Sequence, residues 1–206
     1  DGRADRASIS SQLGACVRVL VNGAWGFVSA DTTSRRRLLV ALDEAIELAR
    51  SSAARVTDPA AVAQIKPVAA VFRTKSVRDP REVSTADKVA AVKSYESAAR
   101  KHGGSAIVNS QVSYSDDVVS EMIANTQGTL IEQHSTTTYI ACRVAVVRDN
   151  LRQTGSERKG IIGGYELVDT TMAEDFSILA VDRAMTLLSA KPAPAGKFPV
   201  VFDPSG

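Results

Sequence analysis

The chain has 206 residues, of which 44% are hydrophobic and 23% are charged, a composition typical of a globular protein. This length is enough for one sizeable hydrophobic core, or for two small ones. The 25 basic and 23 acidic residues give a net charge of +2, which argues against a strong electrostatic field directed at nucleic acid or an anionic membrane.

The first predicted element is a β-hairpin over residues 13–30, which follows a polar stretch, 1–12, that we interpret as a disordered or cloning-derived lead-in. Apolar residues at alternate positions of the first strand indicate that one of its faces is buried. Asn22 and Gly23 can supply the two positive-φ positions of a type I′ turn. Gly26 stands between two aromatic residues, which suggests a close backbone approach or a bulge.

A helix is predicted next, from possible N-caps at residues 31–34 to about Arg55. One stripe at helical spacing is apolar, and charged residues occupy much of the remaining surface. The stripe that we expect to be buried consists of Leu38, Leu42, Ala45, Ile46, Ala49 and Ala53. Residues 56–83 are interrupted by prolines and have no sustained period, although a short strand is predicted at 68–73.

The segment from Ser84 to Asp87 resembles a capping box and predicts the start of a second helix. The expected inward residues are Val89, Val92 and Ala99. A cationic turn at 100–102 is followed by two glycines, which predicts the end of this helix.

From Ser105 to Glu157 the pattern changes to consecutive strands. The predicted strands are 105–114, 119–125, 129–135, 138–148 and 151–157, with turn signals at 115–117, 127–128 and 149–150 between them. The residues expected on one buried face of the fourth strand are Ile140, Cys142, Val144 and Val146. Short strands joined by tight turns predict an antiparallel meander.

A glycine-rich junction at 160–164 precedes a third amphipathic helix, from about Met172 to Ser189. The expected buried stripe of this helix is Phe176, Ala180, Ala184, Leu187 and Leu188. A proline- and alanine-rich extended linker follows, and then a strand-like run, 198–202. Taken together, the pattern predicts an α+β fold, with an antiparallel β-meander and an N-terminal hairpin packed with about three amphipathic helices.

Neither histidine has a neighbour that would mark a catalytic or metal site. His102 is predicted at a helix C-terminus, where a cation is favourable, and His134 at a strand end among Ser and Thr residues. Cys16 and Cys142 lie in apolar runs without CxxC spacing, and we expect both to be reduced core thiols.

The other polar motifs have structural interpretations. The glycines of 160–164 lack the signature of a P-loop or dinucleotide site, so a hinge is expected there. The basic clusters 35–37 and 100–102 are expected on solvated helix faces, although a binding role for the first stays open. The acidic pairs are Asp43-Glu44, Asp116-Asp117 and Glu174-Asp175; adjacent side chains diverge, so none predicts a paired-carboxylate mechanism. No catalytic, metal-binding or cofactor-binding residue is predicted.

Three blocks, in order, resemble the TldD/PmbA family. Residues 14–31, "GACVRVLVNGAWGFVSAD", are similar to its N-terminal hairpin, and residues 122–167, which end in a Gly-Tyr-Glu triplet, to its middle block. Residues 184–206, with "PAPAGKFPVV", resemble the junction to the next domain and are closer to the TldD branch. The chain also ends on an apolar run that leads into a turn, so we expect it to be a piece of a longer protein.

The resemblance implies a TldD/PmbA-like N-terminal α+β domain at 13–190. It implies that 191–206 form a linker and first strand towards an absent C-terminal metallopeptidase domain. The parent would be a zinc-dependent peptidase, historically labelled a modulator of DNA gyrase, whose His-Glu-x-x-x-His zinc helix lies beyond this junction. No ligand of that zinc can be assigned to a position in this sequence.

The same resemblance implies that this part is non-catalytic and contributes scaffold, dimer surface and peptide-binding surface to an enzyme acting on peptides or unfolded proteins. The implied partners are such substrates and a homodimeric or heterodimeric TldD/PmbA-type subunit, and one strand edge of 105–157 is the hypothetical peptide site. The alternatives are a PmbA-like non-catalytic partner subunit and a DNA gyrase-associated regulator, which the near-neutral charge disfavours. No apolar run approaches the ~20 residues of a membrane helix, so a cytoplasmic location is the default expectation.

Overall fold

The computed structural model describes residues 2–192 and 195–201, and the chain divides into two compact units. The first, here called the hairpin unit, comprises residues 8–68 and 125–129. The second, here called the sheet unit, comprises the described parts of 1–7, 69–124 and 130–206. The α+β class predicted from the sequence is confirmed, because helices and mainly antiparallel strands occur in separate blocks.

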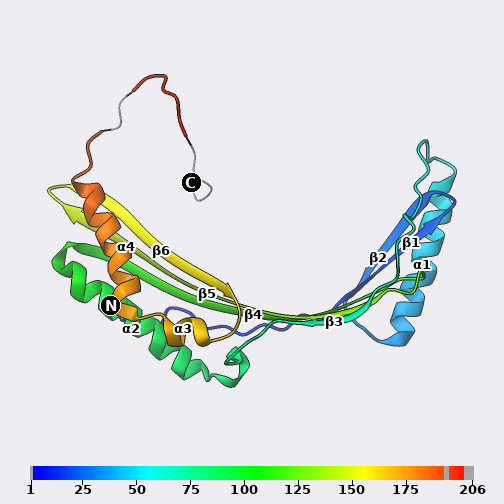
Figure 1. Ribbon diagram of the computed structural model, residues 1–206, viewed down its shortest axis with the longest axis horizontal. Helices are drawn as coiled ribbons and strands as arrows, with labels where there is room; N and C mark the ends of the chain where they lie inside the picture. Colours follow the sequence, from blue (N-terminus) through cyan, green and yellow to red (C-terminus); the bar gives the residue numbers. More distant parts are fainter. Residues whose placement is uncertain (1, 193–194, 202–206) are drawn as a thin grey trace. The chain divides into compact units, whose positions relative to one another are not determined.

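The hairpin unit is built from two antiparallel strands and one helix. Strand β1 (Ala15–Val21) pairs with β2 (Ala24–Ala30), and α1 (Arg35–Ala53) lies along them (Figure 1). Asn22 has φ 48° and Gly23 has φ 79°, which confirms the predicted type I′ turn. Ser34 is the N-cap of α1, since its hydroxyl accepts a hydrogen bond from the backbone N–H of Arg37.

Helix α1 packs so closely on β2 that their backbones are in contact at Gly26. A Cβ atom added to Gly26 would lie 1.9 Å from the carbonyl oxygen of Ala45, so the close approach predicted at this glycine is confirmed. The fully buried residues of α1 are Ala41, Ala45 and Ala49. The prediction that Leu42 is buried was wrong, because a helix this close to a strand leaves room only for alanine in the contact face.

Cys16 is exposed, so its prediction as a core thiol was wrong. The valines of β1 face α1, and the strand alternation turns Cys16 to the opposite face of the hairpin. In the rest of this unit, residues 54–68 form no helix and no strand; they begin with the turn that ends α1 at Ala54. Backbone contact holds this segment at Gly23, whose carbonyl accepts from the N–H of Ala60 at 2.9 Å.

The sheet unit is organised around one long central strand. Strand β5 (Leu130–Arg148) pairs along one side with β4 (Ile107–Ala124) and along the other with β6 (Leu151–Ile162), both antiparallel. β3 (Ala69–Arg73) runs parallel to the first residues of β5. The antiparallel meander and the strand at 68–73 are thus confirmed, and the parallel pairing of β3 makes the sheet mixed.

The meander has three long strands rather than the five that the sequence suggested. Asp116 stays within β4 opposite Thr138, and β5 continues without a break through 135–138. Lys88 lies 2.7 Å from the Asp116 carboxylate, so this polar position is satisfied inside the strand and does not need a turn. The tight turn at Asp149 and Asn150, with φ 49° and 66°, is confirmed.

Helices cover one face of the β4–β5–β6 portion of the sheet. Ser84 caps α2 as predicted, by accepting from the N–H of Asp87 at 3.1 Å. The helical elements of this unit are α2 (Thr85–Gly103), α3 (Glu166–Thr170) and α4 (Ala173–Leu188), with 3-10 turns at Pro80–Glu82 and Gly104–Ala106. The short α3 was not predicted.

The core of the sheet unit lies between β5, α2 and α4. The predicted β5 face and four predicted helix positions are confirmed as buried: Ile140, Cys142, Val144, Val146, Ala99, Phe176, Ala180 and Ala184. The prediction that Leu187 lies in the core was wrong, since it is 44% exposed, and Val181 is buried instead. Tyr95, which the prediction omitted, packs edge-on against Phe176 at a centroid distance of 5.7 Å. Gly155 of β6 lets α4 approach closely, because a Cβ there would lie 2.0 Å from the carbonyl oxygen of Ala180.

After α4 the chain turns at Ser189, and residues 189–192 and 195–201 contain neither helix nor strand. The predicted strand-like run therefore has no strand over 198–201, and Phe202 lies outside the described residues. Within the described ranges, no helix is both long and apolar enough to cross a lipid bilayer.

Candidate functional site

The most prominent candidate binding feature of the sheet unit is the outer edge of β4. This strand has 18 residues and pairs only with β5, so one row of its backbone groups has no strand partner among the described residues. The Asn125 N–H donates to the Thr129 carbonyl, which fixes the alternation of paired and outward groups. By that alternation, the even-numbered residues of β4, including Val118 and Ser120, direct their N–H and C=O groups outwards.

The part of the sheet near β3 carries exposed apolar side chains. Phe72 is 54% exposed and Met122 is 68% exposed, although both lie in paired strands. The exposed large apolar residues of this region, here called the β3 patch, are Val71, Met122 and Leu130 on one face of the sheet and Phe72 and Ile123 on the other. Exposed apolar side chains that gather in one region are typical of a surface that another polypeptide covers.

The Gly-Tyr-Glu triplet, residues 164–166, is held against the segment that precedes α2. The Tyr165 N–H donates to the Arg78 carbonyl at 2.8 Å, and the Arg78 N–H donates to Glu166 Oε2 at 3.1 Å. Arg78 also reaches Asp169 at 2.8 Å and lies 4.8 Å from the centre of the Tyr165 ring. These contacts, here called the Arg78 clamp, connect two segments that are distant in the sequence.

The Arg78 clamp also explains why glycine occupies positions 163 and 164, where a side chain has no room. A Cβ at Gly164 would lie 2.1 Å from the Arg78 carbonyl oxygen, and Gly163 and Gly164 are both buried. The hinge predicted at 160–164 was therefore wrong, because Gly160 belongs to β6 and the last two glycines are packed. Burial opposes ionisation of Glu166, but hydrogen bonds from the N–H groups of Gly164 and Arg78 outweigh it and hold the pKa of Glu166 below its ordinary value.

The two histidines lie on different elements and face different partners. His102, in the last turn of α2 as predicted, places Nε2 2.8 Å from Asp182. His134 lies inside β5 rather than at a strand end, with Nδ1 3.0 Å from the Ser120 hydroxyl and Nε2 3.9 Å from Glu132. The last distance is beyond a hydrogen bond, so these three side chains form a cross-strand contact and not a relay.

The remaining charged candidates are dispersed. Arg35, Arg36 and Arg37 are exposed in the first turn of α1. Arg100 pairs with Glu96, whose carboxylate also accepts from the Ser110 hydroxyl at 2.6 Å. Over 2–192 and 195–201, no three His, Cys, Asp or Glu side chains are placed so that they could share a metal ion. The residues that are described therefore do not fit a zinc site.

Comparison with known proteins gives the family. Residues 78–188, more than half of the chain, match the PmbA/TldA metallopeptidase central domain, and residues 1–53 match domain 1 of the same metallopeptidases. The chain belongs to the PmbA/TldD family. The resemblance noted in the sequence is thereby confirmed, and the Arg78 clamp lies within the matched central domain of this PmbA/TldD protein.

Curated relatives carry the name metalloprotease. The chain is 29% identical to one from Methanothermobacter thermautotrophicus, with 99% of this chain and 43% of the relative covered. It is 31% identical to one from Synechocystis, with 98% and 43% covered. The PmbA/TldD chain thus spans less than half the length of these relatives.

Solved structures agree with the fold. A Thermotoga maritima protein described as a candidate modulator of a DNA gyrase superposes with a TM-score of 0.76 at 19% identity, over 95% of this chain and 42% of that one. TldE from Thermococcus kodakarensis superposes with a TM-score of 0.65 at 15% identity, over 89% of this chain and 40% of that one. At these identities the likeness establishes the PmbA/TldD fold alone.

Sequence reasoning missed the residues of the Arg78 clamp and the outward-facing row of β4. The clamp had one signal, since the Gly-Tyr-Glu triplet stood out, but nothing in the sequence pointed to Arg78 as its partner. The length of β4 was hidden by Asp116 and Asp117, which are common in turns.

Proposed function

We propose that this chain is the N-terminal, non-catalytic part of a TldD-like zinc-dependent metallopeptidase that acts on peptides or unfolded proteins. The match of most of the chain to two domains of PmbA/TldD metallopeptidases carries this proposal. Relatives more than twice as long leave room for a further domain. The zinc would be held by residues outside this chain, because the described residues do not fit such a site.

The contribution of this part to substrate binding would come from the edge of β4. An extended peptide can add as a strand to an open edge, where main-chain hydrogen bonds give affinity that depends little on sequence. Such a site suits an enzyme that takes unfolded substrates. The edge is long and contains no proline, which supports the assignment.

Dimerisation, with a second copy or a PmbA-type subunit, would use the β3 patch. Its apolar side chains are too exposed for a surface that always faces water. Replacing Met122 with Lys would place a charge in that interface. We expect Met122→Lys to lower the dimer fraction in analytical ultracentrifugation, with Ile9→Lys as a matched exposed control that leaves it unchanged.

The edge is tested by proline substitution, because proline removes one N–H. Ser120→Pro removes an outward N–H of β4, and Thr154→Pro removes one from the outer edge of β6, where the pairing of Arg148 with Leu151 sets the alternation. With a fluorescent unfolded casein fragment as probe, we expect Ser120→Pro alone to weaken binding about tenfold. If both variants bind the casein fragment as well as the unsubstituted 206-residue chain does, the β4 site is refuted.

The catalytic assignment is tested by metal content and hydrolysis. We expect the 206-residue chain to contain less than a tenth of a zinc ion per chain in mass spectrometry and to leave the casein fragment intact, while the longer parent binds zinc and cleaves it. Stoichiometric zinc in this chain would refute the proposal. A full-length parent without zinc would favour the second candidate, a PmbA-like non-catalytic partner subunit.

A further inference from the structure

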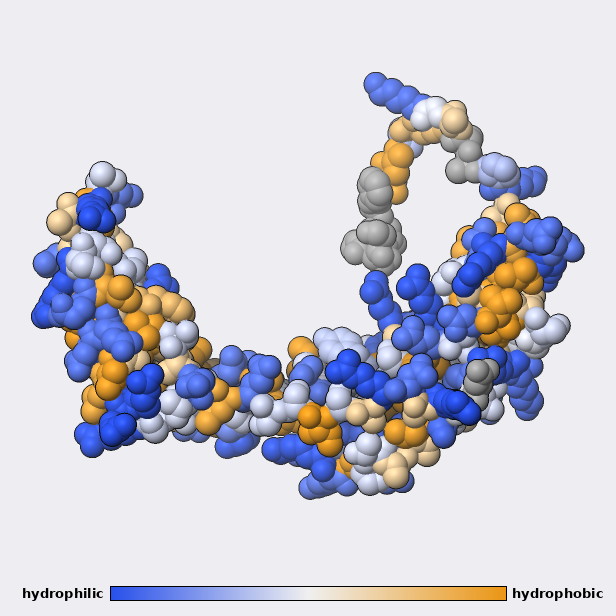
Figure 2. Space-filling view, turned by 180° about the vertical axis from the view of Figure 1, so that it is seen from behind, coloured by the Kyte–Doolittle hydropathy of each residue, from blue (hydrophilic) through white to orange (hydrophobic). Residues whose placement is uncertain are grey.

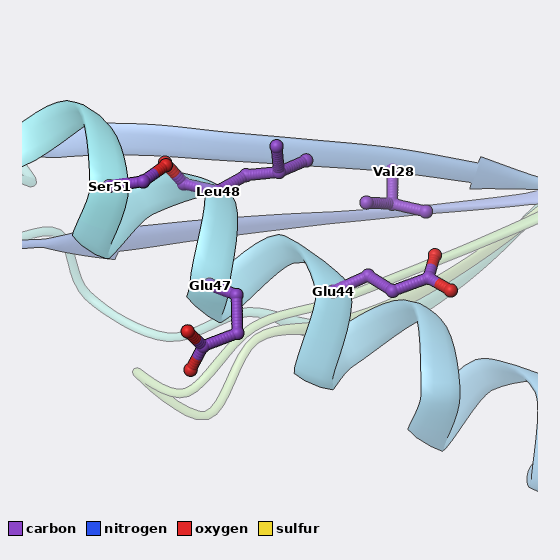
Figure 3. A pocket seen from close by; sticks show the side chains of 5 residues that line it. All are labelled: Val28, Glu44, Glu47, Leu48 and Ser51. Atoms are coloured by element: carbon purple, nitrogen blue, oxygen red, sulfur yellow. The ribbon is translucent and has the colours of Figure 1, made fainter.

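The hairpin unit contains a groove between α1 and the outer edge of β2. Its volume is about 520 Å³, and it is lined by Val28, Glu44, Glu47, Leu48 and Ser51. Figure 3 shows Glu44 and Leu48 extending from α1 towards the side where Val28 lies, whereas Glu47 turns away. Residues 44, 48 and 51 share one face of the helix because they are four and three positions apart. The groove thus has an apolar floor with a carboxylate on it.

One wall of the groove is an unpaired strand edge. The hairpin sheet has only two strands, so β2 has no neighbour beyond β1 among the described residues. The two-residue turn makes Val21 and Ala24 a hydrogen-bonded pair, and pairs alternate from there along the hairpin. Trp25, Phe27 and Ser29 therefore direct their N–H and C=O groups away from β1, along the groove.

The face of the hairpin opposite α1 is also uncovered and carries aromatic side chains. Trp25 is 40% exposed and Phe27 is 58% exposed. Arg18 stacks on Trp25 with 4.0 Å from its guanidinium carbon to the ring centre. Figure 2 shows apolar surface between polar patches over the unit that contains α1. A strand added to β2 would have this aromatic face on one side and the groove on the other.

The charge in the groove indicates what such a strand carries. Glu44 forms no hydrogen bond or ion pair with any described residue, whereas Glu47 pairs with Arg50 at 2.7 Å. An arginine side chain would place its methylene groups on Val28 and Leu48 and its guanidinium at Glu44. Acidic side chains in the same place would be repelled.

We propose that this groove binds an extended peptide segment that adds as a third strand to β2, with basic side chains facing α1 and apolar side chains facing Phe27 and Trp25. The site lies within the hairpin unit, and it requires neither zinc nor the β4 edge. The partner chemistry is an alternating basic and apolar strand, which discriminates by charge in a way that an open edge alone does not.

The test uses the whole 206-residue chain and a fluorescent heptapeptide of alternating arginine and valine, measured by anisotropy at low salt. We expect saturable binding that Glu44→Gln weakens about fivefold, the upper end for one exposed ionic contact. Higher ionic strength should weaken binding as well. Failure of the arginine–valine peptide to bind, or an unchanged affinity with Glu44→Gln, would overturn the proposal.

Charge exchange supplies the specificity control. The unsubstituted 206-residue chain should not bind the matching heptapeptide of alternating glutamate and valine. Glu44→Lys should lose the arginine–valine peptide and gain the glutamate–valine one, which a merely unfolded variant cannot do. If Glu44→Lys binds each of the two peptides with the same affinity as the unsubstituted chain, the groove is not the site.

The strand-addition step has a matched pair of variants. Cys16 and Ser29 face each other across the hairpin. The backbone groups of Cys16 point to the outer edge of β1, and those of Ser29 point to the outer edge of β2. Ser29→Pro should reduce binding of the arginine–valine peptide at least tenfold, while Cys16→Pro should leave it unchanged. Ser120→Pro, which blocks β4, should also leave it unchanged, so that loss of this site is distinguishable from failure of the β4 proposal. Equal loss in Ser29→Pro and Cys16→Pro would exclude strand addition at β2.

Discussion

The backbone N–H of Arg78 donates a hydrogen bond to the Glu166 carboxylate at 3.1 Å, although 88 positions separate the two residues. The same carboxylate accepts from the N–H of Gly164 at 2.8 Å, and the Tyr165 N–H returns a bond to the Arg78 carbonyl. The segment that leads into α2 is therefore fixed to the segment that follows β6 by main-chain groups. Two of these three hydrogen bonds end on one side chain, that of Glu166.

Replacing Glu166 with Ala should destabilise the sheet unit, because the N–H groups of Arg78 and Gly164 lose their acceptor. The expected loss is about 1–3 kcal/mol in the free energy of unfolding, because two hydrogen bonds with a net contribution of about 0.5–1.5 kcal/mol each are lost. Glu174→Ala, at an exposed position in the first turn of α4, is the matched control and should cost less. Chemical denaturation followed by circular dichroism measures both, and equal losses would contradict the role of the clamp.

Stability should fall on acidification, and Glu166 and Glu96 should contribute to the fall. Burial opposes ionisation of Glu96, but Ser110 and Arg100 outweigh it, so the folded-state pKa of both glutamates lies below the unfolded one. Their contribution is fully present above the ordinary glutamate pKa of about 4.3 and is lost as the pH falls through the folded pKa. Urea midpoints between pH 7 and pH 3 measure this. Glu166→Gln should flatten the profile below about pH 5, and an unchanged slope would count against it.

Gly155→Ala should be strongly destabilising. The added methyl group would lie 2.0 Å from the Ala180 carbonyl oxygen and 2.6 Å from the Ala184 nitrogen, and backbone atoms cannot move away cheaply. We expect a loss of about 2 kcal/mol or more and a melting temperature lower by about 4–8 °C. Gly160→Ala is the control in the same strand, because it meets only the exposed ring of Tyr139, and it should cost much less.

The two cysteines should differ in reactivity. Cys16 is exposed, whereas Cys142 is buried and burial raises the pKa of its thiol to about 11. Because the thiolate is the reactive form, a thiol reagent should modify Cys16 alone in the native chain and both residues in urea. Mass spectrometry after a short exposure to N-ethylmaleimide identifies the site, and native labelling of Cys142 would show that α4 opens readily.

Local signals predicted the fold where each needs only its sequence neighbours. Asn22 and Gly23 fix a turn by their own φ angles, and Ser34 and Ser84 cap helices through residues three positions on. Strict alternation predicted the buried face of β5 because one side of that strand is covered by helices. These features depend on the chain within one or two turns of structure.

Features that depend on distant partners were not predictable in the same way. The sequence around Asp116 is typical of a turn, and only the folded structure shows that Lys88 pairs with it inside a strand. Gly164 is likewise typical of a hinge in the sequence, but in the structure it packs against Arg78. Leu42 fits a buried stripe unless the helix lies so close to β2 that only alanine can enter. For the candidate sites, alternation could place Trp25 and Phe27 on one face, but not the groove that α1 makes on the other.

The register of β5 has a consequence for the order in which the sheet assembles. β4 and β5 are joined by the short turn at 125–129, so their pairing can spread from that turn one residue at a time. β3 joins the same strand in parallel and must first close the long loop that contains α2 and the whole of β4. Since closing a long loop costs entropy before any contact forms, β3 should dock late in folding, after the β4–β5 hairpin exists.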